Sequence, residues 1–314
     1  MHYAARLNSF ISPASHGVLE ALARIGAIEG VTHVDLNYPE HFETVSVPQM
    51  RKALEKHGLK MNALNMRFKR PFLRGAYANP SAEIRREAEA LTEKAAQVCR
   101  DMGGDLIIIW LAYDGYDYAM QMDYPQAWNQ LVQTLCTLCR DRRLRFAIEY
   151  KPYEERGFSL LDSYGTTSCL IRETGAQNLG MVLDFCHMLM KKENPAFAAS
   201  LLLSQGKLYG VHLNDGEGHC DNGFMVGMCH PWKTLELLYY LKKHAYEGVV
   251  YFDTFPVREN AEDELAANIA MFEQLWALLD ASAMQAIAQA SANQDGMAVQ
   301  RIFRDFLANG AWRR

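Results

Sequence analysis

The sequence predicts a (β/α)8 barrel, also called a TIM barrel, in residues 1–280, followed by a C-terminal helical extension in residues 281–314. Three observations predict this fold. Eight short apolar runs alternate with amphipathic helical patterns. The alternation fills about 280 residues, close to the roughly 250 residues typical of the fold. An open, doubly wound sheet would usually carry a GxGxxG turn after its first strand, and "LNSFISPASHG" has none.

Each element can be placed in chain order. The eight predicted strands are "YAARLNSF", "VTHVDLNY", "LKMNALNM", "DLIIIWLAY", "LRFAIEYK", "LGMVLDF", "LYGVHLN" and "GVVYFDTF". They are short and mostly apolar, as buried parallel strands are. Apolar residues spaced three and four apart predict helices near residues 17–28, 47–57, 80–102, 124–141, 166–174, 194–204, 233–244 and 261–280.

The extension has no further strand to cover, yet it carries apolar side chains at helical spacing. These residues are Ile287, Met297, Val299, Ile302, Phe303, Phe306 and Leu307. A helix with an apolar stripe must bury it against another element. We therefore expect the extension to pack on the barrel or on a partner subunit of a homo-oligomer, either a dimer or a tetramer.

Composition excludes several classes of function. The formal charge is −5, from 32 basic and 37 acidic residues, and no basic block suggests a nucleic-acid partner. No apolar run approaches the roughly 20 residues of a membrane span, and the first residues do not resemble a signal peptide, so a cytoplasmic protein is expected. Seven scattered cysteines suit reduced thiols. The lack of a Gly-rich phosphate loop predicts no organic cofactor.

Four successive predicted strands end in a side chain that can bind a metal ion. They are Glu149, Asp184, His212 and Asp253. Barrel chemistry takes place where the carboxyl ends of the strands meet, so these side chains should converge. Three carboxylates and an imidazole suit Mn²⁺, Mg²⁺ or Co²⁺. For a single Asp or Glu, a capping or solvated role would be the simpler interpretation; four in register favour a metal site.

Two further polar residues accompany the ligand set. Lys151 follows Glu149 by two residues, so both side chains lie on the same side of the strand and the ammonium group can reach the barrel mouth as a catalytic group. A salt bridge from Lys151 to Glu154 or Glu155 is the structural alternative. His187 follows Asp184 by three residues and can enter the same pocket, or remain an ordinary loop histidine.

The substrate side of the mouth is less well defined. Aromatic rings would provide an apolar wall for a bound substrate, and the candidates are Phe10, Trp110, Tyr113, Tyr116 and Phe185. The stretch "RFKRPFLRGAY" could bind an anionic group through Arg67, Lys69, Arg70 and Arg74. A solvated basic loop explains the same residues.

These residues together resemble the xylose isomerase-like TIM barrels, a superfamily of sugar isomerases and ketose epimerases. "IEYKPYEER" resembles the pattern of strand five, and "IIIWLAYDGYDY" resembles that of strand four with its Trp and Gly-Tyr-acid run. "VLDFCH" resembles the acidic ligand followed by a His. "HLNDGEGHCDNGF" and "FDTFPVREN" resemble the last two strand-end segments. The resemblance covers most of the chain and is closer to rhamnose isomerase and tagatose 3-epimerase relatives than to classical xylose isomerase.

The resemblance implies further roles. Glu149, Lys151, His187 and Asp253 would be catalytic; Trp110, Tyr116, His187 and Arg258 would contact the sugar; and His187, His219 and Asp221 could hold a second metal. Only one of the family's two acidic positions is present for that second metal. Asn65 and Arg67 stand where the family places a ring-opening His.

The resemblance also limits the reaction. Lys151 and the short Asp253 favour a metal-dependent isomerase that interconverts an aldose and a ketose. A ketose 3-epimerase, which transfers a proton between two carboxylates, is the alternative. A dehydratase, an inositol-pathway enzyme, a subunit of a C-glycoside-cleaving complex and an endonuclease IV-like phosphodiesterase stay open, although the negative charge disfavours the last.

Overall fold

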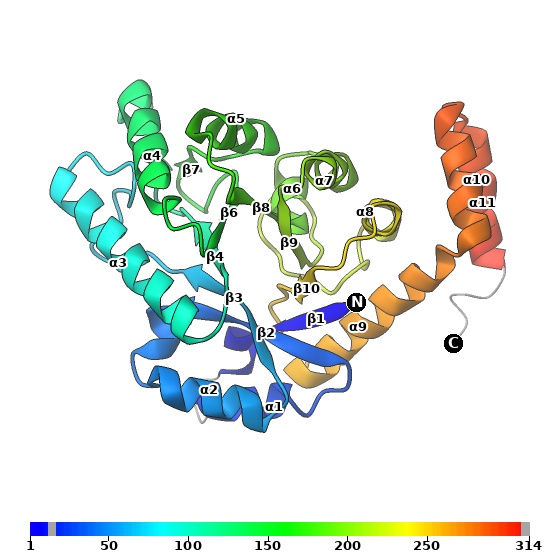
Figure 1. Ribbon diagram of the computed structural model, residues 1–314. Coiled ribbons are helices and arrows are strands. Elements are labelled where there is room, and N and C mark those ends of the chain that lie inside the picture. Colours follow the sequence, from blue (N-terminus) through cyan, green and yellow to red (C-terminus); the bar gives the residue numbers. More distant parts are fainter. Residues whose placement is uncertain (12–16, 309–314) are drawn as a thin grey trace.

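The structure, a computed structural model, describes residues 1–11 and 17–308 and contains a closed barrel of eight parallel strands (Figure 1). The strands neighbour one another in the order β1-β10-β9-β8-β6-β4-β3-β2. Their bounds are β1 (His2–Arg6), β2 (Val31–Tyr38), β3 (Lys60–Met66), β4 (Leu106–Trp110), β6 (Arg145–Glu149), β8 (Leu179–Asp184), β9 (Leu208–Leu213) and β10 (Val249–Phe252). The predicted TIM barrel is therefore confirmed.

Helices surround the barrel, as Figure 1 shows. The helices that follow the strands are α1 (Val18–Ile25), α2 (Val47–Lys56), α3 (Ala82–Asp101), α4 (Tyr124–Leu138), α5 (Tyr164–Thr174), α7 (Pro195–Ser204), α8 (Pro231–Lys243) and α9 (Ala261–Leu278). Polar N-cap residues begin several of them: Ser81, Asp123, Ser163, Asn194 and Asn260 each accept a backbone N–H of the first turn. Such caps pair donors that would otherwise lack partners, and they fix where each helix begins.

The barrel interior is closed below its mouth by a small apolar cluster. The cluster contains Ala63, Leu106, Ile108, Ala147 and Val182. Because side chains alternate along a strand, residues two apart face the same side. Ala147 stands two residues before Glu149, and Val182 two before Asp184. The apolar cluster therefore lies one layer beneath the polar residues at the strand ends and separates them from the bottom of the barrel.

Several elements were not expected from the sequence. The chain after β1 turns into a 3-10 helix, η1 (Leu7–Phe10), where the sequence predicted more strand. A second 3-10 helix, η2 (Glu40–Phe42), follows β2, and a short helix, α6 (Phe185–Met190), follows β8 directly. A small antiparallel sheet of β5 (Gly115–Tyr116) and β7 (Phe158–Ser159) lies outside the barrel. These pieces are too short to show a periodic pattern.

The predicted extension forms two helices, α10 (Ala281–Ala292) and α11 (Gly296–Ala308), which Figure 1 places beyond α9 at the edge of the molecule. Phe303 of α11 stacks on Trp232 of α8, with ring centroids 4.3 Å apart. Met297 and Leu307 are exposed. Residues 309–314 of the extension lie outside the described residues. None of the described helices is both long and apolar enough to cross a membrane.

Candidate metal centre

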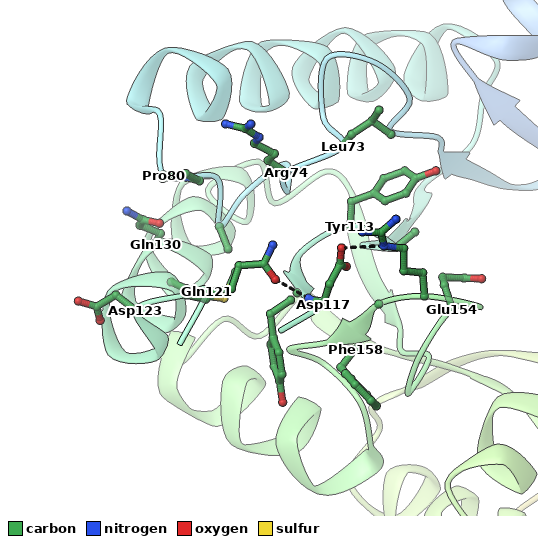
Figure 2. A pocket seen from close by; sticks show the side chains of 18 of the residues that line it. Leu73, Arg74, Pro80, Tyr113, Asp117, Gln121, Asp123, Gln130, Glu154 and Phe158 are labelled. Atoms are coloured by element: carbon green, nitrogen blue, oxygen red, sulfur yellow. Dashed lines mark hydrogen bonds and ion pairs between the residues drawn. The ribbon is translucent and has the colours of Figure 1, made fainter. Parts of the chain in front are cut away.

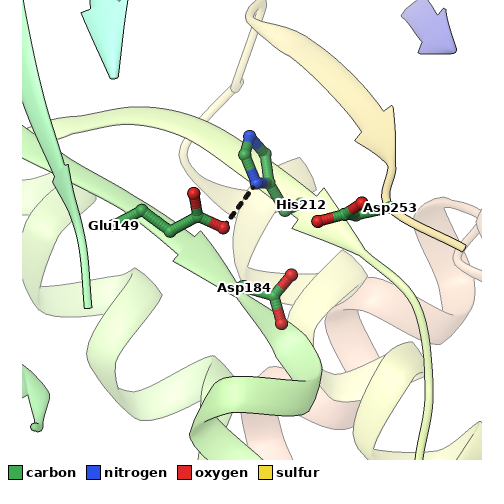
Figure 3. A group of neighbouring side chains, drawn as sticks. All are labelled: Glu149, Asp184, His212 and Asp253. Atoms are coloured by element: carbon green, nitrogen blue, oxygen red, sulfur yellow. Dashed lines mark hydrogen bonds and ion pairs between the residues drawn. The ribbon is translucent and has the colours of Figure 1, made fainter. Parts of the chain in front are cut away.

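Four strand ends deliver the predicted ligand set to one place. Glu149 and Asp184 are the last residues of β6 and β8, His212 lies in β9, and Asp253 follows β10 directly. Asp184 and His212 are also register partners on adjacent strands. Each of the four offers one ligand atom, and these atoms all lie within 4.8 Å of one another. Figure 3 shows the four side chains turned toward a common point.

Glu149 and His212 form the closest pair in this group. Nδ1 of His212 lies 2.9 Å from Oε1 of Glu149. Burial alone would raise the pKa of Glu149, but the neighbouring His212 imidazolium holds it at about 2. Burial likewise opposes the charge on His212, yet Glu149 raises the pKa of His212 to about 9. A proton on Nδ1 thus occupies the position where a divalent ion would supply positive charge.

Asp184 and Asp253 complete the set. Burial raises the pKa of Asp184 to about 7 and also raises the pKa of Asp253. Oδ1 of Asp184 accepts the backbone N–H of His187 at 2.9 Å, and Oδ2 accepts the Asn214 amide at 3.0 Å. Nε of Arg6 forms an ion pair with Asp253 at 2.9 Å. Crowded, buried carboxylates of this kind are stabilised in their charged form by a cation.

Unpaired polar atoms gather at the same point. Among the described residues, ten buried side-chain N or O atoms lack a hydrogen-bond partner, and six of them belong to residues that line the cavity over this group. The six residues are Asn65, Trp110, His187, His212, Asp221 and Asp253. Buried polar atoms are nearly always paired in folded proteins, so this concentration indicates a place built for a ligand. The donor set, all oxygen and imidazole, fits a hard divalent ion.

His187, Asp221 and Lys151 form a second polar group beside the first. Oδ2 of Asp221 lies 3.1 Å from Nε2 of His187 and 3.2 Å from Nζ of Lys151. Burial opposes the charge on Asp221, but its contacts with His187 and Lys151 hold its pKa well below the usual range. Asp184, His187 and Asp221 could together hold an ion. His219, expected in that set, is exposed and belongs to neither group.

Lys151 forms the salt bridge that the sequence offered as the structural alternative, and it also lies at the barrel mouth. Its Nζ pairs with Glu154 at 2.8 Å, which is the expected salt bridge, and it also lines the cavity beside Asp221. Burial would lower the pKa of Lys151, but Asp221 and Glu154 together raise it. The ammonium group is therefore held charged at the barrel mouth.

The loop between β9 and α8 places Asp221. Asp215, directly after Asn214, is buried and pairs its backbone with Phe224, which closes the loop into a narrow turn. Its carboxylate accepts the backbone N–H groups of Cys229 and His230, both at 2.8 Å. These contacts fix the segment that carries Asp221. The sequence resemblance pointed to this loop but gave no sign of Asp215 as its organiser.

A cavity of about 120 Å³ lies over the four predicted ligands. It is lined by Arg6, Asn65, Arg67, Trp110, Glu149, Lys151, His187, His212, Asp221, Tyr251, Asp253 and Phe255. Three of these lining residues, Arg6, Tyr251 and Phe255, were not predicted from the sequence. Arg6 could have been found by the same signal as the ligands, because it is the last residue of its strand.

A carboxylate in the first half of the barrel supports His212 and was also missed. Asp35 of β2 is buried, and its Oδ2 lies 3.9 Å from Nε2 of His212. Asn62 and Asn65 donate to Asp35 at 2.7 and 3.3 Å. Burial raises the pKa of Asp35 to about 6. At 3.9 Å the two atoms form no hydrogen bond, so Asp35 acts on His212 through its charge, which helps to raise the pKa of that imidazole.

Several predicted substrate contacts lie elsewhere. Tyr113 and Tyr116 line a separate pocket of about 690 Å³ near the β5-β7 sheet, shown in Figure 2. Phe10 is buried in η1 with the Arg24 guanidinium over its ring, and Phe185 is buried in α6. Arg258 is exposed and does not line the cavity. Of the predicted contacts to sugar, Trp110 and His187 are the ones that line the cavity.

The chain belongs to the family described as the xylose isomerase-like TIM barrel, whose model matches residues 19–275. It is 24% identical over 259 residues to the xylose isomerase of Thermus thermophilus, covering 78% of this chain and 67% of that protein. Its fold is similar to a D-tagatose 3-epimerase-like protein, with a TM-score of 0.70 and 14% identity over 88% of this chain and 98% of that chain. An L-ribulose 3-epimerase gives a TM-score of 0.68 and 15% identity over 88% and 95% of the two chains.

Proposed function

From this family membership we propose that the chain is a metal-dependent sugar isomerase that interconverts an aldose and a ketose. The observation that carries the proposal is the position of Lys151. Its charged ammonium group lines the same small cavity as Glu149, His212 and Asp253. A fixed positive charge beside a metal site is suited to stabilising negative charge on a sugar carbonyl oxygen.

Glu149, Asp184, His212 and Asp253 would hold the divalent ion, and Mn²⁺, Mg²⁺ or Co²⁺ fits this donor set. When bound, such an ion polarises a carbonyl and lowers the pKa of the neighbouring hydroxyl. Hydrogen transfer between two adjacent carbons then needs no organic cofactor. His187, with Asp221 and Asp184, would offer a second position for an ion.

The chain's own residues would orient the substrate and hold its protons. Lys151 is fixed by Glu154 at 2.8 Å and Asp221 at 3.2 Å, so its ammonium group is positioned before the substrate arrives. Preorganised donors of this kind lose little energy to reorganisation during the reaction. Trp110 lies 5.6 Å, from ring centroid to Nζ, from the same ammonium group and would place an aromatic face against the sugar.

The geometry favours an isomerase over a 3-epimerase. Proton transfer on both faces of a carbon needs two carboxylates that are free to act as bases, one on each side of that carbon. The ligating oxygens of Glu149 and Asp253 lie within 4.8 Å, and Asp253 is also paired with Arg6. That spacing suits a shared ion. The alternative of a 3-epimerase would instead use Glu149 and Asp253 as the two bases.

The fate of the transferred hydrogen tests the proposal. The Mn²⁺-loaded protein would be incubated in deuterated water with pentoses, hexoses, deoxysugars and the corresponding uronic acids and sugar phosphates, and the products followed by NMR. We expect an aldose and a ketose to interconvert with retention of the substrate hydrogen, because Glu149 and Asp253 would be committed to the ion. Inversion at C3 with deuterium incorporation would establish the epimerase instead. No turnover of any sugar by fully loaded protein would contradict both.

A further inference from the structure

Two arginines and one lysine line the cavity over Glu149, Asp184, His212 and Asp253, and two of these three side chains are paired. Arg6 forms its ion pair with Asp253 at 2.9 Å. Lys151 is paired with Glu154 and Asp221. Arg67, which follows β3 directly, differs from both: its guanidinium has no ion pair and no hydrogen bond among the described residues. It is half-buried and lies over the Trp110 ring, 5.1 Å from the centroid.

An unpaired, half-buried guanidinium requires an explanation. Arginine stays charged at any physiological pH and offers five N–H donors in a planar fork. Stacking on Trp110 fixes the plane of that fork but satisfies none of its donors. The indole Nε1–H of Trp110 is itself buried without a partner among the described residues. The wall formed by Arg67 and Trp110 therefore presents donors and no acceptor.

The surrounding carboxylates do not pair with Arg67. Glu149 is paired with His212, Asp253 with Arg6, and Asp221 with His187 and Lys151. If these groups also hold a divalent ion, their negative charge is committed to it. Arg67 then remains as a positive charge at the edge of the cavity without a direct partner among the described residues, and its longer-range attraction to Glu149 is shared with His212 and His187.

We propose that Arg67 binds an anionic group of the substrate, so that the sugar processed at this site is a sugar acid and not a neutral sugar. This inference rests on the proposed function and specifies its substrate class. A carboxylate matches the guanidinium fork in a bidentate geometry. A phosphate ester shares this chemistry, but a cavity of about 120 Å³ favours the smaller carboxylate.

The other cations of the same loop do not face this cavity. Lys69 is exposed and pairs with Glu40 at 3.6 Å. Arg70 is exposed, and Arg74 lines the separate 690 Å³ pocket. Of the four basic residues in this loop, Arg67 is therefore the one placed to bind an anion in this cavity. Arg70 provides a matched control, since it is an arginine three residues further along the chain and lies outside the cavity.

Binding of matched probes tests the proposal. The full-length, Mn²⁺-loaded protein would be titrated calorimetrically with pentoses and hexoses, with the corresponding uronic acids and with the corresponding sugar phosphates. We expect uronic acids to bind at least about 10-fold more tightly than neutral sugars. Arg67→Met should remove that preference, a loss of roughly 10–100-fold for one charge-assisted bidentate contact. Arg70→Met should keep it, and Mn²⁺ affinity should be unchanged in both variants.

Each outcome decides the question. Tighter binding of a sugar phosphate that depends on Arg67 would support an anionic substrate and assign its charge to phosphate. Equal binding of neutral and anionic sugars, or an anion preference that survives Arg67→Met, would overturn the inference. Arg67-dependent binding without turnover would retain the inference and remove the proposed isomerase. Turnover of neutral sugars at the same rate in wild type and Arg67→Met would retain the proposed isomerase and overturn the inference about its substrate.

Discussion

The two halves of the barrel bring different chemistry to one mouth. The second half, β6 to β10, supplies the metal-capable side chains Glu149, Asp184, His212 and Asp253. The first half, β1 to β4, supplies cations, an amide and an indole to the same cavity, through Arg6, Asn65, Arg67 and Trp110. From this difference we propose that one half holds the ion and the other orients the substrate.

Lys151 is the exception to this division, because it is the one lysine or arginine from the second half that lines the cavity. Lys151→Met retains much of the stem volume and removes the charge. If the ammonium group stabilises negative charge on the carbonyl oxygen, kcat should fall on the order of 10²-fold with a much smaller change in KM. Steady-state kinetics on Mn²⁺-loaded protein measures this effect.

The control for that variant is Glu154→Gln, which removes the salt-bridge partner and leaves the ammonium group in place. We expect its kcat to stay within a few-fold of wild type. A purely structural salt bridge would make the two variants alike, with stability lowered by roughly 0–1 kcal/mol and turnover nearly unchanged. Lys151→Met with at least a third of wild-type turnover would remove this residue from the mechanism.

Asp35 is the point where the first half supports a ligand of the second. Asp35→Asn keeps the shape of the side chain but removes the negative charge 3.9 Å from Nε2 of His212. We expect Mn²⁺ affinity to fall roughly 10–100-fold, the scale seen for carboxylates behind ligating histidines. Asp114→Asn is the matched control, because Asp114 is equally buried but pairs with backbone N–H groups of Ala76 and Ala78. Equal Mn²⁺ affinity in Asp35→Asn and wild type would contradict the supporting role.

The pKa values of buried histidines also differ between the two halves. Carboxylates raise the pKa of His187 and His212 to about 9 against the effect of burial, whereas burial lowers the pKa of His41 to about 4. His41 accepts the Asn37 backbone N–H at 2.9 Å and is buried. Below pH 6.5 the unfolded chain binds a proton at His41 more readily than the folded chain does. Stability from this residue is therefore present above pH 6.5 and lost as pH falls toward 4.

The size of this effect is up to about 3 kcal/mol, from 1.36 kcal/mol per pKa unit. Urea unfolding of wild type and His41→Gln between pH 4 and 8 measures it. We expect the difference between the two proteins to shrink as the pH falls from 6.5 to 4. A difference that is constant across this range would show that the pKa of His41 is not lowered in the folded protein.

The smallest effect on the site is expected from the C-terminal extension, which is distant from both halves of the mouth (Figure 1). We propose that its exposed apolar residues, including Met297 and Leu307, contact a second copy of the chain. Removal of residues 281–314 should then yield a smaller species by light scattering, with Mn²⁺ affinity unchanged. An oligomer of unchanged subunit number would exclude this role.

Much of the barrel and of its ligand set could be predicted from the sequence, for one physical reason. Buried parallel strands read as apolar runs, and a polar residue at the end of a run must face either solvent or the mouth. That signal placed Glu149, Asp184, His212 and Asp253 together. The same signal is present at Arg6, the last residue of β1, but a cationic side chain does not fit a set of metal ligands.

The remaining residues could not be placed because loops and side-chain packing decide them. Tyr116 enters the separate pocket because Gly115 and Tyr116 pair with Phe158 and Ser159 in a sheet too short to show a pattern. Phe10 is buried because the chain turns into η1 one residue after β1. The proximity of Asp35 to His212 could not be predicted, because it depends on how the barrel brings β2 and β9 together.

The most direct test of the division between the halves is calorimetric titration of Mn²⁺ into four variants. Glu149→Ala and Asp253→Ala change the second half, whereas Asn65→Ala and Arg67→Met change the first half. We expect the second-half variants to lose more than about 10²-fold in Mn²⁺ affinity, beyond the loss typical of a supporting residue. Arg67→Met should bind Mn²⁺ like wild type, and Asn65→Ala, which removes one of the two donors to Asp35, should lose less affinity than the second-half variants. Full Mn²⁺ occupancy in Glu149→Ala and Asp253→Ala would contradict the account.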